Sequence, residues 1–279
     1  MPFDLLRKPG ELPKLVGHRG ACDVAPENTM ASFTRACLDG ADIVELDVRL
    51  TADNHVVVIH DKDVERTTNG AGLVAAMTLT ALQKLDAGTW FDPEFAGERI
   101  PVLDEVLVWA KGKIALMIEL KFDPYGSFNP DLVPIVLALI EQRGMQEQVV
   151  FISFQPRALQ QVKSLSPAYH VGLMPSRDRL LKTFVWMSKR FPVLVRFGFM
   201  KHVLLRPLAA TLASGCDVVG PNIDVVTPLL VKASHDVGIP VSSGGMVWNY
   251  PEAIAMGLDT IGANNPGLIR QRYLITNPD

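Results

Sequence analysis

The sequence predicts an α/β fold, specifically a (β/α)8 TIM barrel with a small insertion after the second strand. The chain has 279 residues, of which 48% are hydrophobic, and barrels of this type run to about 250 residues as one unit. Short β-branched runs alternate with longer amphipathic ones, as expected for parallel strands joined by helical crossovers. The first candidate strand is not followed by the GxGxxG run of dinucleotide-binding folds. A barrel is therefore favoured over an open sheet.

Eight candidate strands support the barrel, because eight strand-helix units close a ring more naturally than they fill an open sheet. They are Lys14–His18, Ile43–Val48, Ile114–Leu120, Val149–Phe154, His170–Met174, Asp217–Pro221, Pro240–Ser243 and Thr260–Ala263. Amphipathic stretches between them predict helices. The clearest of these are Met30–Leu38, Pro130–Arg143, Pro156–Leu165 and Thr227–Val237.

One region breaks the alternation after the second strand. Between Val56 and Arg99 the sequence has a further short strand, Val56–His60, and then a turn-rich segment with several glycines. We interpret residues 56–99 as an insertion. Loops that follow barrel strands lie over the carboxyl-terminal mouth, where barrel enzymes carry out their chemistry.

Charge and cysteine content narrow the functional class. The net charge is −3 and the isoelectric point about 6.1, which argues against a nucleic-acid-binding protein. Three widely spaced cysteines, Cys22, Cys37 and Cys216, indicate neither a disulfide framework nor a metal site. The segment from Met1 to Leu15 has no signal-peptide core, so a cytoplasmic location is expected. The sequence carries no signal for an oligomeric state.

The second strand contains Glu45-Leu46-Asp47-Val48. Because side chains alternate along a strand, Glu45 and Asp47 should share one face. Two buried carboxylates repel each other unless positive charge lies between them. The alternative is that each forms a separate ion pair with Lys or Arg.

A turn is predicted after the second strand, at Thr51-Ala52-Asp53-Asn54. If it centres near Asp53 and Asn54, the returning strand is antiparallel and residues whose numbers add to 107 face each other. That register places His60 opposite Asp47, and a slip of one residue would still leave His60 beside the carboxylates.

The ends of the first and third strands contribute further charged groups: His18 and Arg19, then Glu119 and Lys121. Three carboxylates without a cysteine cluster favour a hard cation, Mg²⁺ or Ca²⁺. Arg19 and Lys121 suit an anionic phosphate. Two histidines can act as acid and base near neutral pH. These residue types together indicate phosphodiester cleavage of a small-molecule substrate.

The chain resembles the glycerophosphodiester phosphodiesterase family in an ordered series of motifs, close in detail from about residue 14 to 160. The series comprises His18-Arg19-Gly20, Pro26-Glu27-Asn28-Thr29, Glu45-Leu46-Asp47-Val48, His60-Asp61, Arg66-Thr67-Thr68-Asn69-Gly70, Ile100-Pro101 with Leu103 and Glu105, Glu119 with Lys121, and Ser153-Phe154.

The resemblance implies a single barrel domain over residues 1–279. It also implies metal-dependent hydrolysis of glycerophosphodiesters to glycerol 3-phosphate and an alcohol. By resemblance the site residues have three roles. The metal ligands are Glu45, Asp47 and Glu119, the acid/base pair is His18 and His60, and the phosphate contacts are Arg19 and Lys121. Some relatives proceed through a cyclic phosphate. Asn28 and Thr29 are interpreted as capping residues of the first helix.

The last third of the chain departs from the family pattern. The usual Trp-Thr-x-Asn run is replaced by residues 242–249, Ser-Ser-Gly-Gly-Met-Val-Trp-Asn, and the usual Thr-Asp-x-Pro by Ala263-Asn264-Asn265-Pro266. We therefore expect an altered alcohol pocket and question glycerophosphocholine as the best substrate.

Two alternatives stay open at this level. The first is a lysophospholipase D acting on lysophospholipids, and the second is a non-catalytic barrel that only binds phosphorylated ligands. An enolase-type lyase would need a pair of catalytic lysines and carboxylates on later strands, and we do not find them.

Residues 179–206 hold seven Lys or Arg and no Asp or Glu, interleaved with large apolar residues. This segment either packs on the barrel or makes peripheral contact with a membrane.

Overall fold

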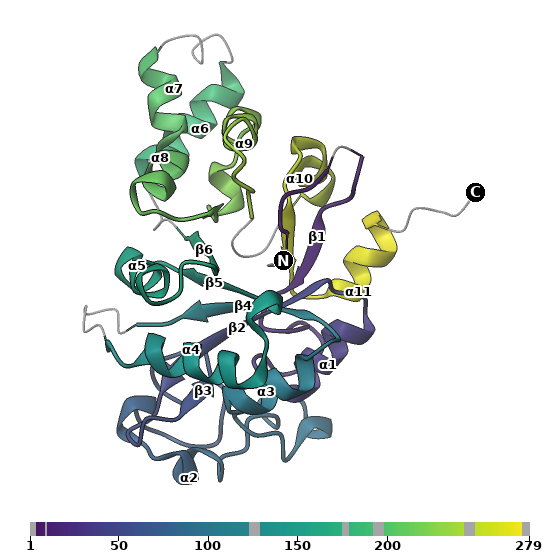
Figure 1. Ribbon diagram of the computed structural model, residues 1–279. Coiled ribbons are helices and arrows are strands. Elements are labelled where there is room, and N and C mark those ends of the chain that lie inside the picture. The colour runs from purple at the N-terminus through teal and green to yellow at the C-terminus, as the bar shows by residue number, and fades with distance from the viewer. Residues whose placement is uncertain are drawn as a thin grey trace.

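A computed structural model describes residues 4–8, 10–122, 129–174, 179–191, 198–242 and 249–274 (Figure 1). Its centre is a curled sheet of parallel strands in the order β7-β6-β5-β4-β2-β1-β8. The strands are β1 (Lys14–Gly17), β2 (Ile43–Leu50), β4 (Ala115–Leu120), β5 (Val149–Ser153), β6 (His170–Leu173), β7 (Val218–Val219) and β8 (Thr260–Ala263).

Two single bridges complete the ring. Val241 pairs with Val219 of β7, and Ser242 pairs with Thr260 of β8, both in parallel. This short segment occupies the place between β7 and β8, and β8 in turn pairs with β1. The predicted eight-stranded α/β barrel is therefore confirmed. The strand predicted at Pro240–Ser243 is reduced to these two bridges, and its last residue lies outside the described part of the chain.

Helices follow most of the strands and lie outside the sheet, with α3, α4 and α5 over β2, β4 and β5 (Figure 1). They are α1 (Met30–Leu38), α2 (Leu79–Leu82), α3 (Leu103–Ala110), α4 (Leu132–Arg143), α5 (Pro156–Leu165), α6 (Arg179–Arg190), α7 (Gly198–Leu204), α8 (Arg206–Ala213), α9 (Pro228–His235), α10 (Tyr250–Met256) and α11 (Pro266–Ile269). Predicted and observed bounds agree for α1 and α5. α4 begins at Leu132 rather than at Pro130.

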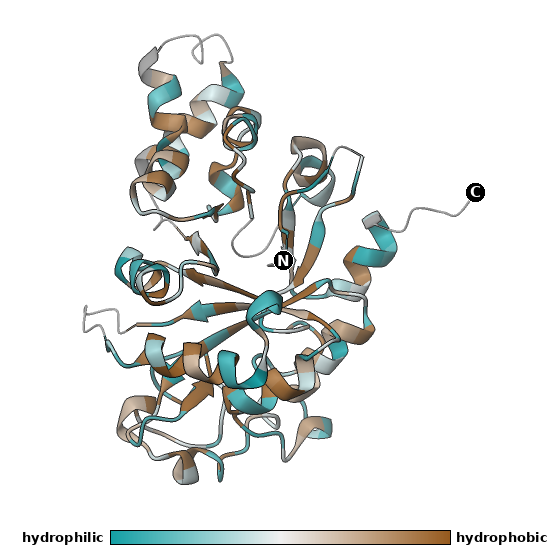
Figure 2. Ribbon diagram, viewed as in Figure 1, coloured by the Kyte–Doolittle hydropathy of each residue, from teal (hydrophilic) through white to brown (hydrophobic). Residues whose placement is uncertain are grey.

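The two faces of each strand bury different groups. On β2, Leu46 and Val48 face outward and pack with residues of α3 and α4. Ile43, on the inner face, packs with Met117 of β4 and other interior side chains. Further along the inner face of β2 come Glu45 and Asp47. Figure 2 shows the hydrophobic colouring of the central strands. The barrel interior therefore changes from apolar to acidic towards the carboxyl ends of the strands.

The insertion begins with β3 (Val56–Val58), which pairs antiparallel with β2. The observed register, Val48 with Val58, differs by one residue from the predicted one, so Ile59 rather than His60 lies opposite Asp47. The turn holds three residues instead of two, with Asn54 in the left-handed conformation at φ 59°. β3 ends at Val58, and His60 lies beyond the ladder.

Helix α6 buries one face and pairs part of its charge. Leu181 and Val185 lie in an apolar cluster with residues of α7. Lys182 Nζ lies 2.5 Å from a carboxylate oxygen of Asp224, and Lys189 Nζ lies 3.0 Å from one of Glu252. In the described parts of the chain, no helix combines the length and the apolar character needed to cross a bilayer.

Candidate active site

Three buried carboxylates meet where β2 and β4 approach the mouth of the barrel. The register pairs Asp47 of β2 with Glu119 of β4, and Glu45 lies two residues before Asp47 on the same face. One oxygen from each of Glu45, Asp47 and Glu119 can be chosen so that all lie within 4.8 Å of one another. The sequence-based expectation that these side chains converge is met.

Two cations hold this cluster together. Lys121 Nζ lies 3.0 Å from Asp47 Oδ1 and 2.6 Å from Glu119 Oε1. Arg19 Nε lies 3.5 Å from Asp47 Oδ2, and the Arg19 backbone N–H donates to Glu45 Oε2 at 2.8 Å. The residues predicted to touch phosphate are therefore in contact with carboxylates in this structure. Their contact with phosphate stays a prediction.

Proton affinity differs sharply within the cluster. Burial, and then the neighbouring charge of Asp47, raises the pKa of Glu45 and of Glu119 above the ordinary value. Burial also disfavours ionised Asp47, but Lys121, His60 and Arg19 outweigh it and lower the pKa of Asp47. The cluster thus holds more acidic groups than its two cations readily balance.

The donor set fits a divalent cation. All three side chains offer carboxylate oxygens, the ligands that Mg²⁺ and Ca²⁺ prefer. Asp47 Oδ1 is buried and accepts no hydrogen bond of good geometry, although Lys121 Nζ is close. A cation among these oxygens would provide the missing partner and relieve the repulsion between Glu45, Asp47 and Glu119.

His18 follows β1, and its ring is held by a chain of side chains. Asn264 Nδ2 donates to Asp23 Oδ1 at 3.0 Å, which turns Asn264 Oδ1 towards His18 Nδ1 at 2.9 Å. Because an amide oxygen can only accept, the His18 proton lies on Nδ1 and the lone pair on Nε2. Burial, and then the charge of Arg19, lowers the pKa of His18. This arrangement favours a neutral ring with a free Nε2.

His60 has a different partner. Its Nδ1 lies 2.7 Å from Asp61 Oδ1, and Arg49 donates two hydrogen bonds to its carbonyl oxygen at 3.0 and 2.8 Å. Burial lowers the pKa of His60, while Asp47 and Asp61 act in the opposite direction. A carboxylate on Nδ1 stabilises the protonated ring more than an amide oxygen does.

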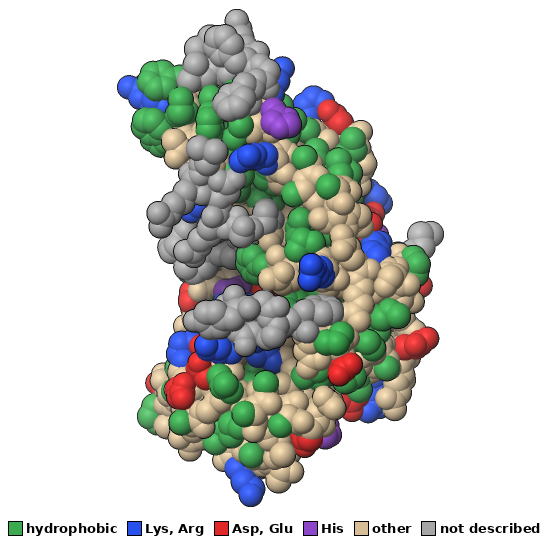
Figure 3. All heavy atoms as spheres, turned by 90° about the vertical axis from the view of Figure 1, so that its left-hand side faces the viewer, with side chains coloured by type: hydrophobic (Ala, Val, Ile, Leu, Met, Phe, Trp, Pro, Cys, Tyr) green, Lys and Arg blue, Asp and Glu red, His purple; other side chains and the backbone are tan. Residues whose placement is uncertain are grey.

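An ionic network connects the two histidine loops. Arg66 binds both carboxylate oxygens of Glu27 at 2.8 Å and Asp61 Oδ2 at 2.5 Å. Glu27 Oε1 also accepts from Arg19 Nη1 at 2.8 Å. Asp61, which orients His60, is therefore linked through Arg66 and Glu27 to the loop that carries His18 and Arg19. Figure 3 shows charged side chains of both signs gathered on the face where β4 ends.

Sequence reasoning missed three residues that act on this site. Asn28 was interpreted as a cap, and Thr29 alone caps α1, accepting from the Ser32 N–H. Asn28 instead donates to Asp47 Oδ2 at 2.8 Å and accepts from the Asp47 N–H at 3.3 Å. Asn264 and Asp61 hold the histidines. The motifs could have pointed to these residues, because Asn28 and Asp61 lie within the family motifs and Asn264 stands where the family pattern has an acidic residue.

An α/β barrel with an acidic cluster and two histidines at its mouth defines a class, namely barrel proteins whose charged site can hold an anionic substrate. Comparison with known proteins narrows this class. Residues 18–261 match the model of the glycerophosphoryl diester phosphodiesterase family. Since this match covers most of the chain, the protein belongs to that family and is a glycerophosphodiester phosphodiesterase, a phosphoric diester hydrolase.

Comparisons with individual proteins support this family assignment. YhdW of Bacillus subtilis (strain 168) is 47% identical over 196 residues, which is 70% of this chain and 78% of that protein. The glycerophosphodiester phosphodiesterase of Caldanaerobacter subterraneus subsp. tengcongensis is 44% identical over 161 residues, 57% of this chain and 65% of that one. A phosphodiesterase from Oleispira antarctica, solved with the product sn-glycerol-3-phosphate, has a TM-score of 0.77 and 25% identity, covering 93% of this chain and 96% of that chain.

Asn28→Gly is expected to lower kcat/KM by about 10- to 100-fold, because Asn28 orients Asp47, a predicted metal ligand, and residues that orient a metal ligand typically matter by that factor. Glycine accepts the positive φ of 57° at this position, so the variant loses the two hydrogen bonds to Asp47 without backbone strain. Steady-state hydrolysis at several Mg²⁺ concentrations measures the loss. Asn28→Ala should lose activity and, in addition, thermal stability. Unchanged kcat/KM in Asn28→Gly would show that Asp47 needs no such support.

Proposed function

We propose that the enzyme hydrolyses glycerophosphodiesters to glycerol 3-phosphate and an alcohol, with one Mg²⁺ or Ca²⁺ held by Glu45, Asp47 and Glu119. The observation that carries the proposal is the convergence of three buried carboxylates at the barrel mouth. The product bound in the Oleispira antarctica phosphodiesterase supports glycerol 3-phosphate as the phosphorylated product here. The cation would supply Lewis-acid polarisation of the phosphoryl oxygens and a fixed positive charge.

The histidines divide the proton transfers. With its Nδ1 proton held by Asn264 Oδ1, His18 presents Nε2 as the base that accepts a proton from the attacking hydroxyl. That hydroxyl belongs either to water, which gives glycerol 3-phosphate directly, or to the 2-position of the substrate glycerol, which gives a cyclic phosphate that water then opens to glycerol 3-phosphate. His60, supported in its protonated form by Asp61, donates a proton to the oxygen of the departing alcohol. After each turnover, proton exchange with water resets both rings.

Arg19 and Lys121 would take up the negative charge of the phosphate. Both lie against the carboxylates of the cluster. Once a divalent cation balances those carboxylates, the two side chains can turn part of their hydrogen bonding to phosphoryl oxygens. We further propose that residues 1–279 form a single domain, since the bridges at Val241 and Ser242 bring the last strands to β1.

A release assay tests the proposal. Purified enzyme with Mg²⁺ or Ca²⁺ is expected to release glycerol 3-phosphate from glycerophosphocholine, glycerophosphoethanolamine and glycerophosphoglycerol at different rates. The rate of each reaction is measured by coupling the release of glycerol 3-phosphate to its enzymatic oxidation. Binding of these compounds without turnover would favour the non-catalytic barrel instead.

A lysophospholipase D activity is the second candidate, and one feature favours it. Within 179–206, Trp186 and Phe191 have 63% and 49% of their surface exposed, and this segment holds Lys and Arg but no Asp or Glu. Exposed aromatic and basic residues suit an anionic lipid surface. Choline release from lysophosphatidylcholine, together with sedimentation on anionic liposomes, distinguishes this candidate. Absence of both would exclude it.

A further inference from the structure

Arg66 is an arginine of the insertion whose guanidinium group binds two carboxylates at once. Its Nη1 and Nη2 atoms each lie 2.8 Å from an oxygen of Glu27, and its Nε lies 2.5 Å from Asp61 Oδ2. Glu27 belongs to the loop between β1 and α1, whereas Arg66 and Asp61 belong to the insertion after β2. Arg66 therefore ties the insertion to the barrel beside the candidate active site.

Asp61 connects Arg66 to the ring of His60. Its Oδ2 accepts from Arg66, and its Oδ1 lies 2.7 Å from His60 Nδ1. Burial acts to raise the pKa of Asp61, but the hydrogen bonds from Arg66 and His60 outweigh it and lower the pKa to about 2. Because an ionised carboxylate can only accept, His60 carries a proton on Nδ1. The proton that His60 can give to a departing alcohol is therefore the one on Nε2.

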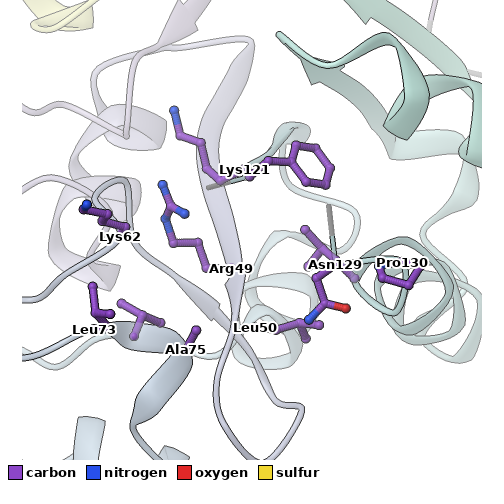
Figure 4. A pocket seen from close by; sticks show the side chains of 11 residues that line it. Arg49, Leu50, Lys62, Leu73, Ala75, Lys121, Asn129 and Pro130 are labelled. Carbon is purple, nitrogen blue, oxygen red and sulfur yellow. The ribbon is translucent and has the colours of Figure 1, made fainter. Parts of the chain in front are cut away.

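The backbone contacts of His60 do not set the direction of its ring. β3 ends at Val58, so His60 lies beyond the ladder, and its side chain is 32% exposed. Arg49, which extends in the same direction as Lys121 (Figure 4), donates two hydrogen bonds to the His60 carbonyl oxygen. These bonds fix the backbone, whereas the side-chain torsions still allow several ring orientations. The observed orientation is the one that reaches Asp61.

We propose that Arg66 is a positioning residue for His60, the proposed acid: it fixes Asp61 to Glu27, and so directs the Nε2 proton of His60 at the oxygen of the departing alcohol. The proposal rests on the hydrolase function proposed above and deepens it. As the P–O bond breaks, this proton moves to the alcohol oxygen, which keeps the bonding electron pair. A lone exposed ion pair would hold its partners weakly, but a forked arginine within a network of charges can fix them.

Arg66→Ala is expected to lower kcat by about 10- to 100-fold for the glycerophosphodiester that wild type hydrolyses fastest, since displacing a reacting group by about an ångström can cost that much. KM should change little, because Glu27 keeps its hydrogen bond from Arg19. Glyceryl 4-nitrophenyl phosphate, whose leaving group departs without a proton, should keep most of its wild-type kcat. A purely structural role of Arg66 would lower kcat for both substrates by the same factor.

A double-mutant cycle shows whether Arg66 acts through Asp61. The variant that combines Arg66→Ala with Asp61→Ala should lose no more kcat than Asp61→Ala alone, because Arg66 then has no carboxylate to fix beside His60. Losses that multiply would contradict the proposal.

Arg143→Ala is the matched control. Arg143 of α4 binds Asp104 of α3 through Nε at 2.6 Å and Nη2 at 2.5 Å, and its side chain is 37% exposed, compared with 44% for Arg66. The control variant therefore loses a similar forked ion pair without touching His60. It should keep the wild-type kcat on both substrates, and thermal unfolding of all variants shows that each is folded.

A measurement on the His60 ring distinguishes this inference from the proposed function. In chelator-treated protein labelled at the histidine ring nitrogens, nuclear magnetic resonance shows which nitrogen carries the proton when the ring is neutral, and His60→Ala assigns the signals. Wild type should have the Nδ1–H form, and Arg66→Ala a mixture of both forms. If wild type hydrolyses no diester, the proposed function fails, whereas this difference should persist. An unchanged Nδ1–H form in Arg66→Ala, or equal losses of kcat on both substrates, would overturn the inference.

Discussion

Alanine at His18 or at His60 is expected to lower kcat for glycerophosphodiesters by about 10²- to 10⁴-fold, the usual contribution of one positioned acid or base. His18 Nδ1 is held by Asn264 and His60 Nδ1 by Asp61, so each ring is fixed in orientation before substrate arrives. Circular dichroism and thermal unfolding should match wild type. His202→Ala, which changes an exposed histidine on α7, is the control and should retain full activity.

The two histidine variants should differ with an activated substrate. Glyceryl 4-nitrophenyl phosphate has a leaving group that departs without protonation, so loss of the acid matters much less than loss of the base. If His60 is the acid, His60→Ala should recover most of its activity on this compound, whereas His18→Ala should not. The opposite pattern would exchange the two roles. Near-full activity of both variants on glycerophosphodiesters would remove both histidines from the mechanism.

Removal of divalent metal is expected to abolish activity, and added Mg²⁺ or Ca²⁺ to restore it. Glu45→Gln and Glu119→Gln keep the size of each side chain but remove one ligand charge. Each should weaken metal binding by at least about 100-fold, since even residues that only orient a ligand matter by 10- to 100-fold. Equilibrium dialysis measures this directly, apart from activity. Full activity in excess chelator would contradict the proposed metal site.

The Glu45→Gln variant should weaken metal binding but increase the stability of the metal-free protein. In metal-free protein, Glu45→Gln is expected to raise the melting temperature, because a neutral amide avoids the free-energy cost of protonating a carboxyl, or of burying its charge, beside Asp47. The pKa of Glu45 is raised on folding, so the unfolded chain releases this proton first and wild-type stability falls as the pH rises above 4.5. The Glu45→Gln variant should lose this part of the pH dependence. Melting curves at several pH values, with and without Mg²⁺, measure both effects.

Much of the site was readable from local pattern. The alternation Glu45-Leu46-Asp47 placed both acids on one strand face, and the structure buries Leu46 against the helices and the acids inside. The predicted register between β2 and β3 differs from the observed one by one residue. The sequence did not distinguish them because two- and three-residue turns share the same polar composition. Only the left-handed backbone of Asn54 distinguishes them.

The contacts that orient His18 and Asp47 could not be predicted from local sequence patterns. Asn264 contacts His18 although the two residues are 246 positions apart in the sequence. The contact lies where β8 pairs with β1. Asn28 bonds Asp47 because its own backbone turns to a positive φ. A cavity beside Lys121 is bounded by Leu73 and Val74 of the insertion, the end of β4 and Leu132 of α4, so no single segment predicts it.

By itself the sequence determined the barrel, four of its helices and the residue types that meet at the mouth. It could do so because hydrophobic periodicity and alternation along strands are local properties. Tertiary structure alone decided the tautomer of His18, the partner of His60 and the support of Asp47. These features depend on distances between segments far apart in the chain, which are set by how the barrel closes.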